Sequence, residues 1–133
     1  MNTTRLMMIG SLAGVILVMT SGWFITGFLC HRFQKATPST WRPENWRQHA
    51  LAVVWSAIGG GALGWLDARV SWGHESLSGA LGFAGLVWTA VGGPAIATLA
   101  TYVNLHRVVV AGLLVEWLVF AAGVSLACLA WAI

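Results

Sequence analysis

The sequence predicts an all-α fold, an integral membrane bundle of four transmembrane helices that forms a single domain over residues 1–133. Charged residues make up only 8% of the chain, whereas soluble domains carry about 25%. The mean hydropathy is +0.77. Apolar runs cover about 7–30, 50–66, 77–102 and 108–133, and about 20 apolar residues cross a ~30 Å hydrocarbon layer. We therefore expect the lipid bilayer to be the main contact of the chain.

The first apolar run, 7–30, is too long for the core of a signal peptide and has no convincing cleavage site. We expect it to remain in the mature chain. It contains Gly10 and Gly14, and small residues four apart let helix backbones approach closely in lipid. Cys30 at its end and Cys128 in the last run are expected at opposite membrane faces, too far apart for a disulfide within one chain.

The loop at 31–49 holds four of the seven basic residues. Trp41 and Trp46, beside arginines, are typical of anchors at the headgroup level. Pro43 suits the first turn of a helix, so the second helix is expected to begin near it. The basic residues of the chain lie in loops rather than on one helix face, which argues against a nucleic-acid partner. Close packing of the second helix is predicted by its glycines, Gly59, Gly60, Gly61 and Gly64.

Residues 67–76 are expected to form a short polar loop in which Asp67 and Arg69 pair at the surface, a contact of little energetic weight. In the third run, 77–102, a mostly small residue recurs every four positions, which predicts a contact face for a neighbouring helix. This ridge consists of Leu81, Gly85, Thr89, Gly93, Ala97 and Thr101. Pro94, after Gly92 and Gly93, removes one backbone donor and predicts a kink.

The tight connection at 103–107 offers Asn104 as a candidate N-cap and makes the last two helices an antiparallel hairpin. Loop charges then predict the orientation. One face carries Arg32, Lys35, Arg42, Arg47 and Arg107, and the other carries Arg5 and Arg69. The positive-inside rule places the first face in the cytoplasm and both termini outside, in a cytoplasmic (inner) membrane.

Short motifs, mainly in the second half of the chain, resemble a known family. They are Trp88 with Pro94 in WTAVGGP, Tyr102 with Arg107 in TYVNLHR, the glycine-containing last run and, more weakly, Trp23 and Phe24 followed by Phe33. These motifs resemble small four-helix bacterial membrane proteins known as domain of unknown function 1761. The resemblance implies a four-helix fold in the cytoplasmic membrane and implies no activity. The chain departs from the family's pattern at Ile25-Thr26, where a Ser-Pro pair is expected, and at Glu116, where a neutral polar residue is expected.

Glu116 is the one acidic residue inside the four apolar runs. Ionisable residues at such depth normally face protein, water or a ligand. Glu116 lies about 13 Å along the helix from Arg107, and Ser21, Ser56 and the break at 92–94 fall at a similar depth. A carboxyl that faces these groups would be hydrogen-bonded and protonated, and one hypothesis is that it relays a proton or cation or orients a polar ligand. The plainer alternative is an interhelical hydrogen bond or an oligomer contact, worth only about 0.6 kcal/mol on average.

Two further sets of side chains are candidates for a site. Trp55, Trp88 and Trp117 lie deeper than the other tryptophans and could line a polar pocket, because each indole N–H needs a partner; ordinary core packing is the alternative. The weaker set falls at helix ends on one predicted face: His31, His49 and His106. Three histidines could ligate a metal or haem, but no close spacing supports this, and interfacial histidines are the plainer interpretation. We expect no metal and no cofactor.

The sequence contains no paired carboxylates, Ser/His/Asp set or Cys-x-x-Cys motif, and no Lys-Ser/Thr follows its glycine runs. A hydrolase, kinase or redox enzyme is therefore not indicated. Three classes of function remain open. The first, which the sequence favours, is a structural or accessory bundle that packs with itself or with a partner membrane protein through glycine-rich helix faces. The second is a small transporter or proton- or ion-conducting protein, a homo-oligomer, that uses Glu116. The third is a membrane cofactor-binding protein or enzyme.

Overall fold

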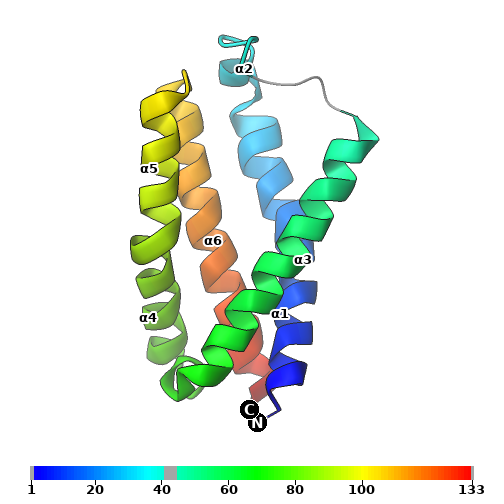
Figure 1. Cartoon of the computed structure of the whole chain (residues 1–133), viewed down its shortest axis with the longest axis vertical. Helices are drawn as coiled ribbons and strands as arrows, with labels where there is room; N and C mark the ends of the chain where they lie inside the picture. Colours follow the sequence, from blue (N-terminus) through cyan, green and yellow to red (C-terminus); the bar gives the residue numbers. More distant parts are fainter. Residues whose placement is uncertain (1, 41–44, 133) are drawn as a thin grey trace.

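The computed structural model describes residues 2–40 and 45–132, and over these residues every regular element is a helix. Four long helical segments run antiparallel in up-down order (Figure 1). The first segment is α1 (Thr3–Leu17) continued by the π-helix η1 (Val18–Leu29), and the second is α3 (Trp46–Arg69). The third segment consists of α4 (Leu77–Val87), the π-helix η3 (Trp88–Gly92) and α5 (Gly93–Tyr102). The fourth is α6 (Arg107–Ala132). Two short helices, α2 (His31–Gln34) and η2 (Ser71–His74), lie in the connections.

All four segments, of 27, 24, 26 and 26 residues, are long and apolar enough to cross a membrane. The second is longer than the predicted 50–66, because its helix extends into the flanking polar residues at both ends. The start of α1 and the end of α6 lie at the same end of the bundle (Figure 1), as the up-down prediction requires. Large apolar side chains such as Met8, Leu12 and Trp23 are exposed on the outside, which is compatible with contact to lipid.

Polar caps fix where the helices begin. The Asn45 side chain accepts a hydrogen bond from the Gln48 N–H at 3.1 Å and caps α3. The helix thus begins at Trp46, whereas the predicted start at Pro43 and the predicted anchor Trp41 lie outside the described residues. The predicted cap of the last helix was wrong. His106, not Asn104, precedes α6, and its Nδ1 accepts from the Val108 N–H at 3.2 Å.

The closest packing joins α1 to α3. A Cβ atom on Gly10 would collide with the Gly60 carbonyl, and one on Gly64 would collide with the Leu6 carbonyl. Only residues without a side chain permit two helix backbones to approach this closely. The predicted glycine faces of the first two segments therefore face each other within one chain, and Figure 1 shows that α3 crosses α1.

The small-residue ridge predicted on the third segment is not its contact face. Leu81, Thr89, Ala97 and Thr101 are exposed, and a Cβ atom on Gly85 would meet no atom within 4 Å. The buried residues are instead Ala80, Phe83, Ala84, Gly92 and Ile96. A repeat of four drifts by about 40° per step around an α-helix of 3.6 residues per turn. A strict repeat of four therefore does not keep to the inward face of the segment. Phe83 and Ile96 fill the interior instead, because their larger side chains make more packing contacts there.

The main apolar core lies between α1, α3 and α6, and its buried members are Leu6, Leu63, Phe120, Val124 and Cys128. Both cysteines are free and buried. Cys30 contacts the carbonyl of Val108 at the start of α6, whereas Cys128 contacts the carbonyl of Leu6 at the start of α1. The two thiols thus lie toward opposite ends of the bundle, as predicted.

Candidate functional site

The middle of α6 is flanked by the two π-helical segments. Gly22 of η1 lies against Glu116, and the Trp88 indole N–H of η3 donates to the Leu114 carbonyl at 2.9 Å. A π-helical turn holds one more residue than an α-helical turn and changes which side chains face a neighbour; such turns are frequent at functional sites. Both π-helical segments therefore contact the part of α6 that carries Glu116.

Glu116 reaches from α6 toward η1. A Cβ atom on Gly22 would lie 2.6 Å from Oε1, so a larger residue at that position would displace the carboxyl. Thr26 lies beside the same group, and its hydroxyl donates to the Gly22 carbonyl at 2.7 Å. Because that proton is already used, the Thr26 oxygen can accept a hydrogen bond from a protonated Glu116. The other oxygen, Oε2, is buried and forms no hydrogen bond with any described residue.

Glu116 is one of the residues that line a cavity of about 550 Å³ between α3 and α6. Most of the lining is apolar or aromatic, and Ser56 and Glu116 carry its polar side chains. Trp55 is 67% exposed and Trp117 is 47% exposed, so both lie where the cavity meets the outside of the bundle. The complete lining consists of Val18, Ala52, Trp55, Ser56, Ile58, Gly59, Glu116, Trp117 and Phe120.

The structure brings together only part of the predicted site. Ser56, Trp55 and Trp117 share the cavity with Glu116, although the Ser56 hydroxyl donates to the Ala52 carbonyl at 2.5 Å. Ser21 does not line the cavity, and its hydroxyl donates to the Leu17 carbonyl at 2.7 Å. Thr26 lies at the carboxyl instead, because the π-helical form of η1 changes the phase of that segment.

The predicted break at 92–94 appears as η3 followed directly by α5, with Pro94 in the first turn of α5. The Gly93 N–H donates to the Trp88 carbonyl, a five-residue step that keeps the backbone bonded next to the proline. A Cβ atom on Gly92 would lie 3.7 Å from the Trp117 ring. The break thus supports Trp117 and does not itself line the cavity.

The histidine prediction finds no support in the geometry. Among the described residues, no group of three or more His, Cys, Asp or Glu side chains is placed to hold a metal ion. His31 and His49 are exposed. His106 caps α6 and stacks on Phe33, with 4.7 Å between the ring centroids. The plainer interpretation, histidines at helix ends, agrees with these positions.

A second buried acid was missed in the sequence. Asp67 was expected in a surface loop beside Arg69, but it lies within α3, is only 1% exposed and faces His74 of η2. His74 Nδ1 is 3.3 Å from Oδ2 of Asp67 and 3.1 Å from its carbonyl oxygen. Arg69 instead lies over the Trp65 ring, 5.0 Å from its centroid. The pairing was wrong because η2 folds back over the end of α3.

Two signals in the sequence could have located this pair. An acidic residue in the last turn of a helix is disfavoured by the helix dipole, so Asp67 needs a compensating partner. Gly73 precedes His74, and a Cβ atom on Gly73 would collide with Oδ1 of Asp67. The close approach of η2 therefore depends on a glycine at that position.

The two acids lie at different levels of the bundle. Asp67 is one turn after Gly64 on α3, which meets Leu6 near the start of α1, whereas Glu116 on α6 lies beside η1. Glu116 is twelve residues before Cys128, whose thiol contacts the Leu6 carbonyl near the start of α1. Twelve residues of α-helix correspond to about 18 Å. Between the acids lies the apolar core, so the bundle has two polar positions separated by packed hydrocarbon.

No family model matches the chain, and no curated protein or solved structure matches it significantly. The resemblance to domain of unknown function 1761 therefore stays a prediction.

Proposed function

We propose that this chain is a multi-pass protein of the cytoplasmic membrane, with both termini outside, that binds an organic cation at Glu116 as part of proton-coupled transport. The observation that carries the proposal is an acidic residue, Glu116, that lines a mostly apolar cavity and has one buried carboxyl oxygen without a hydrogen-bond partner among the described residues. A carboxyl without a counter-charge is costly in such a place unless it is neutral or meets a cation.

The lining of the cavity supports an organic cation as the ligand. Pockets of roughly 300–1,000 Å³ with apolar walls and a few polar groups are typical of small-molecule sites, and this one measures about 550 Å³. Trp55, Trp117 and Phe120 add aromatic rings, which attract cations through their faces. Because the exposed tryptophans lie where the cavity meets the surface, a lipid-soluble cation would enter from the bilayer.

The proposed coupling follows from the charge of Glu116. In the empty cavity the carboxyl holds a proton and can donate it to the Thr26 oxygen. When a cation enters, the proton leaves and the carboxylate pairs with the cation, so the net charge of the buried site stays the same. Binding and protonation then exclude each other, which is the requirement for exchange of a cation against a proton. Four helices rarely enclose a complete path, so we propose that transport takes place in a homo-oligomer.

Tryptophan fluorescence tests the binding step. Tetraphenylphosphonium, a permanent lipophilic cation, is titrated into the purified protein in detergent. We expect saturable quenching that weakens as the pH falls, because protons compete for Glu116. Trp117→Phe should reduce the amplitude of quenching without abolishing binding.

The matched control is Glu75→Gln, which removes the same charge from an exposed position outside the cavity. Glu116→Gln should lose the saturable quenching, and Glu75→Gln should keep it. Binding that is unchanged in folded Glu116→Gln, or absent from the folded wild type, would refute the proposal.

A second candidate function is a structural or accessory protein that packs with itself or a partner membrane protein. The exposed ridge of α4 and α5 favours it, because the glycine faces of α1 and α3 are already occupied within the chain. Gly85→Leu adds a large side chain where a Cβ atom would meet nothing within 4 Å. If the ridge is a contact surface, this variant should lower the oligomeric mass in detergent while the helical content stays constant.

A further inference from the structure

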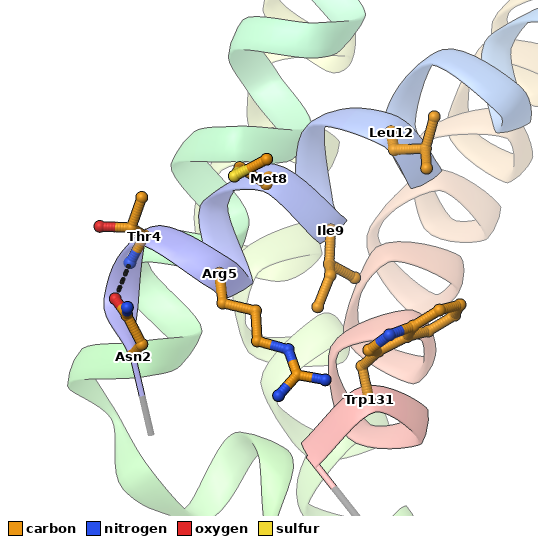
Figure 2. Close-up of a pocket in the computed structure, with 7 residues that line it drawn as sticks. All are labelled: Asn2, Thr4, Arg5, Met8, Ile9, Leu12 and Trp131. Atoms are coloured by element: carbon orange, nitrogen blue, oxygen red, sulfur yellow. Dashed lines mark hydrogen bonds between the residues drawn. The ribbon is translucent and has the colours of Figure 1, made fainter.

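A groove of about 590 Å³ runs along the outside of the bundle where α1 begins and α6 ends. Met8, Ile9 and Leu12 form its apolar floor on α1, and Trp131 forms the opposite wall on α6 (Figure 2). The groove lies at the opposite end of α1 from the Glu116 cavity and shares no residue with it. It is therefore a separate candidate site.

The outer end of this groove is cationic. Arg5 extends along the groove toward Trp131 (Figure 2), is exposed, and forms no ion pair with any described residue. The Asn2 side chain at the same end accepts a hydrogen bond from the Thr4 N–H at 3.0 Å, which orders the start of the helix. A guanidinium binds phosphate well, because its N–H groups match the phosphate oxygens in pairs.

The position of the groove suits a lipid. Arg5 and Trp131 lie at the ends of membrane-length helices, where headgroups are expected and where tryptophan and arginine are enriched. From Arg5 to Leu12 the groove follows α1 for about 10 Å, which is the length of the upper part of an acyl chain. One molecule with an anionic head and an apolar tail would thus satisfy both ends of the groove.

We propose that the groove between the start of α1 and the end of α6 binds an anionic phospholipid, with its phosphate on Arg5 and an acyl chain on Met8, Ile9 and Leu12. Charge decides the lipid class. A zwitterionic lipid offers the same chains but no net negative charge, and a free anion offers no chain for the apolar floor. The inference rests on the membrane placement proposed above, but it does not depend on Glu116.

Native mass spectrometry tests the site. The purified protein is incubated in detergent with equal amounts of phosphatidylglycerol and phosphatidylcholine, and the retained lipids are counted. We expect preferential retention of phosphatidylglycerol. One basic residue near a membrane surface contributes about 1 kcal/mol toward anionic lipid, so Arg5→Gln should lower the preference roughly fivefold. Leu12→Gln should lower retention of both lipids.

Arg69→Gln is the matched control. It removes the same charge at the same end of the bundle, but Arg69 lies over Trp65, outside the groove. It should keep the preference for phosphatidylglycerol, and so should Glu116→Gln, which separates this site from the proposed transport function. Equal retention of the two lipids by the wild type, no effect of Arg5→Gln, or an equal loss in Arg69→Gln would overturn the proposal.

Discussion

Nδ1 of His74 lies 3.3 Å from Oδ2 of Asp67 and 3.1 Å from the Asp67 carbonyl oxygen. The carbonyl oxygen is an acceptor, so this geometry fits the tautomer that carries a proton on Nδ1. The Asp67 side chain is 1% exposed, whereas the His74 side chain is 15% exposed. Removal of His74 therefore leaves the Asp67 side chain out of reach of water, whereas removal of Asp67 leaves a His74 side chain that water can still reach.

This asymmetry predicts unequal costs of mutation. His74→Ala leaves the buried Asp67 carboxyl without its polar neighbour, and a buried polar group left without a partner costs about 1–3 kcal/mol. Asp67→Asn leaves a partly exposed imidazole that water can reach, so its cost should be clearly smaller. Thermal unfolding in detergent, followed by circular dichroism, measures both. In the Asp67→Asn background, His74→Ala should cost much less than it does alone; equal effects in both backgrounds would contradict the pairing.

The close crossing of α1 and α3 leads to a second prediction, on the stability of glycine variants. Gly60→Ala places a Cβ atom against the Gly10 carbonyl, a backbone contact that cannot rotate away. Overpacking of this kind costs about 1–3 kcal/mol, although alanine is the better helix former. Gly82→Ala is the control, because a Cβ atom there meets only Trp72 at 3.7 Å. The first variant should melt at a lower temperature, and the second should melt unchanged or higher. Equal melting temperatures would exclude the tight crossing.

The proposed orientation can be tested by labelling with a membrane-impermeant maleimide. The native Cys30 and Cys128 are buried and should react slowly, so a thiol is introduced at an exposed position on each face. Ser39→Cys lies between α2 and α3, and Glu75→Cys follows η2 at the other end. In intact cells we expect labelling of Glu75→Cys alone, and in lysed cells labelling of both. The reverse pattern would invert the topology.

Trp88 and Trp117 are predicted to behave differently. The Trp88 indole donates to the Leu114 carbonyl, so Trp88→Phe should cost about 0.5–1.5 kcal/mol of stability and leave cation binding unchanged. Trp117 lines the cavity, so Trp117→Phe should change the quenching amplitude. Unfolding curves and tetraphenylphosphonium titrations on the same two proteins measure both properties. Loss of binding in folded Trp88→Phe would place Trp88 in the site after all.

Much of this architecture could be predicted from the sequence, because four apolar runs and the scarcity of charge leave few other folds. The glycines of the first two helices were also predictable, since small residues at helical spacing permit close contact. The face used by the third helix was not, because a four-residue repeat drifts around a helix and bulkier residues compete for the interior.

The environment of Glu116 was only partly predictable. The depth of each residue along its helix correctly predicted that Ser56 lies at the cavity. It also predicted Ser21 beside the Glu116 carboxyl, where the structure has Gly22 and Thr26 instead. A π-helical segment changes the angular position of every residue in it, and local sequence gives no simple sign of one. The position of Asp67 was also predicted wrongly, because its surroundings depend on tertiary packing. Its partner, His74, comes from a turn whose return over α3 is decided by tertiary packing.

The most direct test of the central claim is the number of protons released when a permanent cation binds. Tetraphenylphosphonium carries no exchangeable proton, so any acid released into a weakly buffered detergent solution comes from the protein. If Glu116 is the exchanging group, the wild type and Glu75→Gln should each release about one proton per bound cation. Glu116→Gln should release none. Binding to the wild type without proton release, or the same release from Glu116→Gln, would contradict the claim.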